Sequence, residues 1–206
     1  MKVLLVNGSP NKSNTTCTAL SEVEKSLNAS GIETEVFWLG NKAICECIGC
    51  MACRKLGKCF MDDKVNEFVA KATDFDGFIF GTPVHYAAAS GSITSFMDRV
   101  FFSGGSKLAY KPAACVIAAR RAGTTATFDQ INKYFTINNM PVVSSNYWNA
   151  VHGLNAEETQ QDKEGLQTMR ILGQNMAWLL KCIEMGKQNG LHHPEMQERE
   201  FTNFVH

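Results

Sequence analysis

The sequence has no excess of charge of either sign, because its 206 residues include 20 Lys and Arg against 20 Asp and Glu. A chain without a basic field is not typical of nucleic-acid-binding proteins. No apolar run approaches the roughly 20 residues that a membrane-spanning helix needs, and no signal peptide precedes the first apolar segment. We therefore expect a cytoplasmic protein that binds neither nucleic acid nor membrane.

Two well-known phosphate-binding motifs are also missing. The P-loop pattern G-x-x-x-x-G-K-S/T is absent, and the dinucleotide pattern G-x-G-x-x-G is represented only by Gly8. These absences exclude the standard nucleotide-binding loops. We find no internal repeat, low-complexity segment or convincing linker, which favours a single domain.

What is present is an alternation of apolar strand-like segments with amphipathic helix-like segments. This alternation predicts an α/β fold whose parallel sheet has right-handed crossovers. We expect this domain over residues 1–187, followed by a polar arm over residues 188–206 that packs on the body or on a neighbouring subunit. The expected strands are 2–7, 32–39, 76–81, 113–119 and 140–145. Two helices are expected over 16–29 and 125–135. Three more are expected after a capping residue: one capped by Asp62–Asp63, one starting at Ser90, and a long last helix capped by Asn155 and Glu158.

The loop after the first strand has the properties of an anion site. It runs from Gly8 to Thr16, is rich in hydroxyl and amide side chains, and contains no Asp or Glu. A helix follows at once, so free backbone N–H groups and the positive end of the helix dipole meet there. The loop therefore predicts a phosphate-monoester site, although an ordinary turn with a helix cap is the alternative.

Two further loops are expected beside it, because ligands bind at the carboxyl ends of parallel strands. Residues 82–90 include Pro83 and Tyr86 and leave room for a flat ligand against the backbone. Arg120 and Arg121 follow the fourth strand, where they would neutralise a second phosphate or an anionic ring, or else serve as surface charges. His85 is treated as solvated or satisfied rather than catalytic.

These loops resemble those of the NADPH-dependent FMN reductase group of flavodoxin-like proteins, in particular its iron–sulfur flavoprotein branch, over most of the chain. The resemblance implies a three-layer α/β/α fold with a five-stranded parallel sheet of order 2-1-3-4-5, bound FMN, hydride from NAD(P)H, and a homodimer or homotetramer. It assigns three groups of residues to FMN: Ser9, Pro10, Asn14, Thr15 and Thr16 to the phosphate; Pro83, Val84, His85 and Tyr86 to one side of the ring; and Arg120, Arg121, Ala122, Gly123 and Thr124 to the other side.

Five of the eight cysteines fall between Cys45 and Cys59, and four of them form the pattern Cys47-x2-Cys50-x2-Cys53-x5-Cys59. Such spacing is more typical of iron–sulfur clusters than of zinc, which usually pairs two short knuckles across a longer gap. A 4Fe-4S cluster, redox-active or free thiols, and zinc all stay open, because spacing alone does not select the metal. A cluster would require all four sulfur atoms to converge.

The combined features predict an FMN-dependent oxidoreductase that passes electrons from NAD(P)H to a small acceptor such as a quinone, an azo or nitro compound, or free flavin. One alternative is an iron–sulfur flavoprotein that transfers electrons between partner proteins. Another is a non-enzymatic thiol sensor on the same scaffold. The arm and the apolar Phe101–Phe102 region would complete the pocket of a neighbour, so we expect a homodimer or a larger even assembly.

Overall fold

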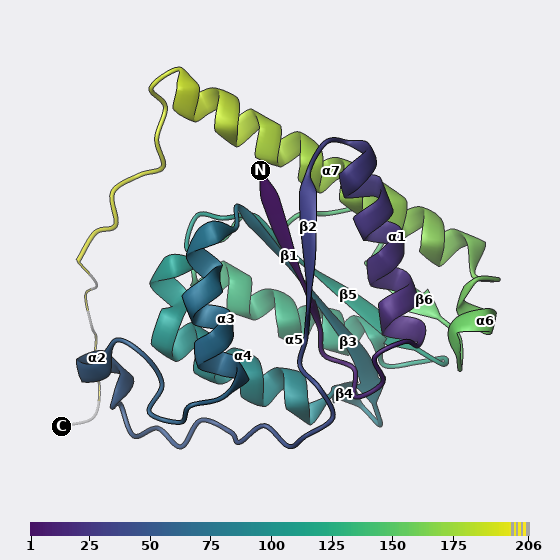
Figure 1. The fold of residues 1–206 in the computed structure, drawn as a ribbon, viewed down its shortest axis with the longest axis horizontal. Helices are drawn as coiled ribbons and strands as arrows, with labels where there is room; N and C mark the ends of the chain where they lie inside the picture. The colour runs from purple at the N-terminus through teal and green to yellow at the C-terminus, as the bar shows by residue number, and fades with distance from the viewer. Residues whose placement is uncertain (199, 201, 203, 205–206) are drawn as a thin grey trace.

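The computed structural model describes residues 1–198, 200, 202 and 204, so part of the expected arm lies outside the described residues. Its sheet has the order β2-β1-β3-β5-β6 with all neighbours parallel, and a short β4 pairs antiparallel with β3 (Figure 1). The strands are β1 (Lys2–Asn7), β2 (Glu33–Trp38), β3 (Gly77–His85), β4 (Ala88–Ala89), β5 (Ala113–Ala119) and β6 (Ala150–His152). With the β4 hairpin set aside, this is the predicted order 2-1-3-4-5.

Helices cover both faces of the sheet, which confirms the three-layer prediction. Alternate side chains of β1 enter opposite cores, with Leu4 and Val6 on one face and Val3 and Leu5 on the other. The first face is covered by α3 (Lys64–Lys71), α4 (Gly91–Gly104) and α5 (Thr124–Ile137), and the second by α1 (Thr15–Ala29) and α7 (Lys163–Gln188). Shorter elements are α2 (Cys53–Leu56), α6 (Ala156–Thr159) and the 3-10 turns Ala72–Asp74 and Gly105–Lys107.

The fifth strand lies later in the chain than the sequence predicted. Within the expected segment 140–145, only Val142 forms an isolated bridge, to Ala113. Pro141 has no N–H group for a ladder, and the chain turns at Ser145, whose Oγ donates to the carbonyl oxygen of Tyr147 at 2.6 Å. Pairing with β5 is then made by β6, through the apolar Val151 opposite Ala118.

The expected final helix is two helices, because the segment contains two capping residues. Asn155 accepts a hydrogen bond from the backbone N–H of Glu158 at 2.8 Å and starts α6. Asp162 accepts one from the N–H of Gly165 at 2.9 Å and starts α7. Neither of these helices, nor any other helix of the described chain, is long and apolar enough to cross a membrane.

Candidate cofactor cleft and cysteine pocket

The loop that follows β1 and the carboxyl ends of β3 and β5 meet in a cleft of about 260 Å³ at the carboxyl edge of the sheet. Nine of the predicted cofactor residues line it: Ser9, Pro10, Asn14, Thr15, Thr16, Pro83, Val84, His85 and Arg120. Its other lining residues were not predicted from the sequence; they are Asn11, Ala118, Ala119, Gly153 and Leu154. Gly153 and Leu154 follow β6, and they were missed because the fifth strand was assigned too early.

The phosphate side of the cleft is made by the start of α1. Asn14 takes the extended backbone conformation of an N-cap residue, with φ −141° and ψ −161°, but its side chain makes no capping hydrogen bond. The first turn of α1 contains no acidic residue. An uncapped, uncharged helix start with hydroxyl side chains at Thr15 and Thr16 therefore fits the phosphate of FMN.

Hydrogen bonds within the loop, and from the ends of β1 and β2, hold the loop in place. Asn7 Oδ1 accepts from the N–H of Ser9 at 3.0 Å, and Ser9 Oγ accepts from the N–H of Asn11 at 3.2 Å. Trp38 Nε1 donates to the carbonyl oxygen of Ser9 at 2.8 Å, which fastens the loop to the end of β2. The cleft is thus braced from two strands.

Gly8 is required for the close approach of this loop to β3. Its N–H donates to the carbonyl oxygen of Gly81 at 2.8 Å. A Cβ atom on Gly8 would lie 2.9 Å from that oxygen and 2.9 Å from Cδ1 of Ile93. The backbone oxygen cannot move aside as a flexible side chain would.

We expect Gly8→Ala to lower the free energy of unfolding by about 1–3 kcal/mol, as overpacking of a buried site does. Gly91→Ala is the matched control, because a Cβ there meets no atom within 4 Å, and its effect should stay within about 1 kcal/mol. Urea denaturation of both variants measures the difference. Equal losses would contradict the role assigned to Gly8.

The predicted residues that do not line the cleft are Tyr86, Arg121, Ala122, Gly123 and Thr124. Tyr86 is fully exposed and has a positive φ of 63°, which is uncommon for a residue with a Cβ. Gly123 has φ 88°, and a Cβ on it would lie 2.8 Å from Cγ1 of Val84. The loop after β5 therefore packs against the end of β3, beside the cleft that Val84 lines.

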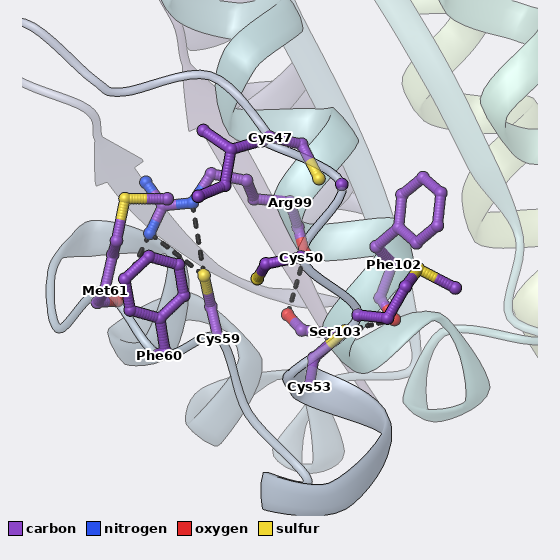
Figure 2. Close-up of a pocket in the computed structure, with 12 residues that line it drawn as sticks. Cys47, Cys50, Cys53, Cys59, Phe60, Met61, Arg99, Phe102 and Ser103 are labelled. Carbon is purple, nitrogen blue, oxygen red and sulfur yellow. Dashed lines mark hydrogen bonds between the residues drawn. The ribbon is translucent and has the colours of Figure 1, made fainter.

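The four cysteines of the motif line a second, separate pocket. Figure 2 shows Cys47, Cys50, Cys53 and Cys59 around it, with Phe60 and Phe102 among its walls. Cys59 is buried and Cys50 is exposed. As the side chains stand, the described residues contain no group of three or more His, Cys, Asp or Glu that could hold a metal ion, so the sulfur atoms do not show the convergence that a cluster requires.

Arg99 of α4 organises this pocket and is only 1% exposed. Its guanidinium donates to both carboxylate oxygens of Asp63 at 2.6 and 2.9 Å. Two of its nitrogens also donate to Sγ of Cys59 at 3.3 Å each, as Figure 2 shows. It also donates to the carbonyl oxygens of Cys45 and Met61, each at 3.2 Å. One side chain therefore connects both ends of the cysteine loop.

Burial alone would lower the pKa of Arg99, but the hydrogen bonds to Asp63 and Cys59 outweigh burial and raise that pKa above its usual range. A permanent positive charge thus lies beside one of the four thiols. Four soft thiol ligands, apolar walls and a buried cation are groups that suit an anionic iron–sulfur cluster, in kind and in number.

The role of Arg99 was not predicted from the sequence. The one signal there was its position on the apolar face of a helix, between Phe96 and Val100.

The chain is similar in sequence to proteins of one known family. The family model described as NADPH-dependent FMN reductase matches residues 1–155. An iron–sulfur flavoprotein of Methanocaldococcus jannaschii is 34% identical over 194 residues, which cover 89% of this chain and 100% of that protein. An iron–sulfur flavoprotein of Methanosarcina thermophila is 25% identical over 191 residues, covering 91% of this chain and 99% of that protein.

Solved structures show the same fold at low sequence identity. A flavodoxin from the domain Archaea superposes with a TM-score of 0.61 at 13% identity, covering 88% of this chain and 99% of that one. An NAD(P)H:quinone oxidoreductase from Methanothermobacter marburgensis gives a TM-score of 0.66 at 14% identity, covering 85% and 96%. These two likenesses establish the flavodoxin-like fold and nothing beyond it.

Proposed function

Because the chain belongs to the NADPH-dependent FMN reductase family, we propose that it is an FMN-containing electron-transfer protein that also carries an iron–sulfur cluster. The observation that supports this proposal is the presence, in one chain, of the cleft at the sheet edge and the four-cysteine pocket around Arg99. The relatives named iron–sulfur flavoproteins support the same combination. When bound, flavin and cluster supply the redox chemistry.

The chain's own residues bind and orient these groups. Ser9, Asn14 and Thr16 would hold the FMN phosphate at the start of α1, where helix dipole and N–H groups favour an anion. The backbone of residues 83–86 would flank the ring on one side, and Arg120 would place a positive charge near it. Cys47, Cys50, Cys53 and Cys59 would supply the thiolates, with Arg99 donating to Cys59.

We expect the double variant Ser9→Ala, Thr16→Ala to bind FMN about tenfold more weakly or worse, because two hydrogen bonds to a charged phosphate are lost. Fluorescence titration of flavin-free protein with FMN measures the affinity. Thr73→Ala with Thr136→Ala removes two hydroxyls away from the cleft and should leave the affinity unchanged. An unchanged affinity in the first double variant would remove the phosphate assignment.

The source of the electrons separates this proposal from an NAD(P)H-dependent reductase, the activity that the family's description favours. The experiment mixes the oxidised holoprotein anaerobically with NADPH, with NADH, and with reduced methyl viologen, and follows flavin absorbance in a stopped-flow instrument. An electron-transfer protein is reduced rapidly by the viologen and slowly by either nicotinamide. Rapid bleaching by NADPH or NADH, followed by turnover with a small acceptor, would establish the reductase instead.

We also propose that the protein is a homodimer or a larger even assembly. Around the cysteine pocket, Ile48, Leu56, Phe60 and Phe102 are all about half exposed or more. Exposed apolar side chains gathered near one pocket are typical of protein–protein contacts. Within the C-terminal arm, the ring of His193 stacks on Tyr110 at 4.3 Å, which supports packing of the arm's first part on its own body.

A further inference from the structure

Another cavity, of about 170 Å³, lies beside the cofactor cleft and is distinct from the cysteine pocket. β6 and the two residues after it connect this cavity with the cleft, because Ala150 and His152 line the cavity whereas Gly153 and Leu154 line the cleft. The start of α5 contributes Thr124 to the cavity. None of the functions considered so far uses this cavity.

One wall of the cavity is an exposed aromatic pair. Tyr147 and Trp148 are 60% and 52% exposed, and their ring centroids lie 4.8 Å apart at 61°. The turn that carries them is braced, since Ser145 Oγ bonds to the carbonyl oxygen of Tyr147 at 2.6 Å and to Oδ1 of Asn149 at 2.7 Å. A rigid aromatic surface offers stacking area to a flat ligand at a small entropic cost.

The lining also has a polar part that includes two carboxylates, those of Asp162 and Glu164. Asp162 accepts from the backbone N–H of His152 at 2.7 Å, and its Oδ2 lies 3.7 Å from Nδ1 of the same residue. Asp162 is therefore fixed, and the imidazole of His152 lies within the cavity wall. Thr124 adds a hydroxyl donor, whereas Glu164 adds a second negative charge. These groups favour a neutral ligand with hydrogen-bond acceptors over an anion.

We propose that this cavity binds a neutral, planar aromatic carbonyl compound of the quinone class. The ring stacks on Trp148, and the carbonyl oxygens accept hydrogen bonds from His152 and Thr124. This inference deepens the proposed function by assigning a place to a small electron carrier next to the flavin cleft. Binding itself requires no electron transfer, so it is tested separately from that function.

The test is isothermal titration of the oxidised holoprotein with duroquinone, whose fully substituted ring does not add cysteine thiols. We expect saturable binding to the natural chain and an affinity about tenfold lower in Trp148→Ala, the loss expected for one stacking contact. Trp148→Phe keeps an aromatic face and should bind within about threefold of the natural chain. Trp178→Ala is the matched control, since Trp178 is 68% exposed on α7 and does not line the cavity.

Three outcomes would overturn the proposal. The first is no saturable binding to the natural chain, and the second is an unchanged affinity in Trp148→Ala. The third is a loss in His85→Ala without one in Trp148→Ala, which would place the quinone at the cofactor cleft that His85 lines. A preparation without flavin or iron would instead contradict the proposed function and leave the titration result to stand by itself.

Discussion

Replacing Arg99 by methionine is expected to lower the free energy of unfolding by about 2–3 kcal/mol, somewhat less than for a fully buried ion pair, because the remaining partner, Asp63, is 35% exposed. Methionine fills much of the same volume but removes the guanidinium donor from the carbonyl oxygens of Cys45 and Met61 and from the carboxylate of Asp63, which keeps the N–H of Val65 at 3.1 Å. The cysteine loop should loosen as a result. Urea denaturation measures the loss, and the rate of alkylation of the thiols measures the loosening.

The matched control is Arg170→Met. Arg170 also pairs with a carboxylate, that of Glu22 at 2.7 Å, but its side chain is 47% exposed. Such exposed pairs contribute at most about 1 kcal/mol. Arg99→Lys tests the fork geometry, because it keeps the charge but loses the paired bonds to Asp63 and Cys59, so its stability should fall between the natural chain and Arg99→Met. If Arg99→Met and Arg170→Met cost the same, Arg99 does not hold the loop.

The second large effect concerns iron. We expect Cys59→Ala to reduce the iron content of anaerobically purified protein from about four atoms per chain, the number in a cubane, to nearly none. Cys59 is the buried cysteine of the pocket and the one that Arg99 contacts. Its loss removes both a ligand and the thiol closest to the positive charge. Colorimetric iron analysis gives the number directly.

Cys45→Ala and Cys182→Ala are the controls for this variant. Cys45 contacts Arg99 through its carbonyl oxygen, and its side chain does not line the pocket, while Cys182 lies on α7. Both should keep their iron. If Cys59→Ala keeps it and Cys45→Ala loses it, the cluster is present and the fourth ligand is Cys45 rather than Cys59.

The alternation of strands and helices and the loops of the cleft could be predicted because they depend on local patterns, whereas the sheet order was implied by the family resemblance. β1 is an unbroken apolar segment that ends in Gly8, and the polar loop up to Thr16 precedes an amphipathic helix, so periodicity and turn residues suffice. The fifth strand could not be predicted in the same way. Val142 and Val143 have the composition of a strand, but only tertiary pairing with β5 selects Val151.

The two pockets differ in the same respect. Spacing alone grouped Cys47, Cys50, Cys53 and Cys59, because these residues are close in sequence. Arg99 lies 40 residues after Cys59, and its contact with that sulfur depends on how α4 packs against the cysteine loop. The aromatic pair Tyr147–Trp148 was not predicted as part of a site for a similar reason. It directly precedes β6, the strand that the sequence pattern had placed at residues 140–145.

The central claim, that one chain holds both FMN and an iron–sulfur cluster, is tested most directly by one measurement on protein purified without oxygen. Absorption spectroscopy with flavin and iron analysis should give one FMN and about four irons per chain, the complement of a single cubane. Paramagnetic resonance of the dithionite-reduced sample should then show a cluster signal. Flavin without iron or a cluster signal would contradict the cluster, and a colourless protein would contradict the account as a whole.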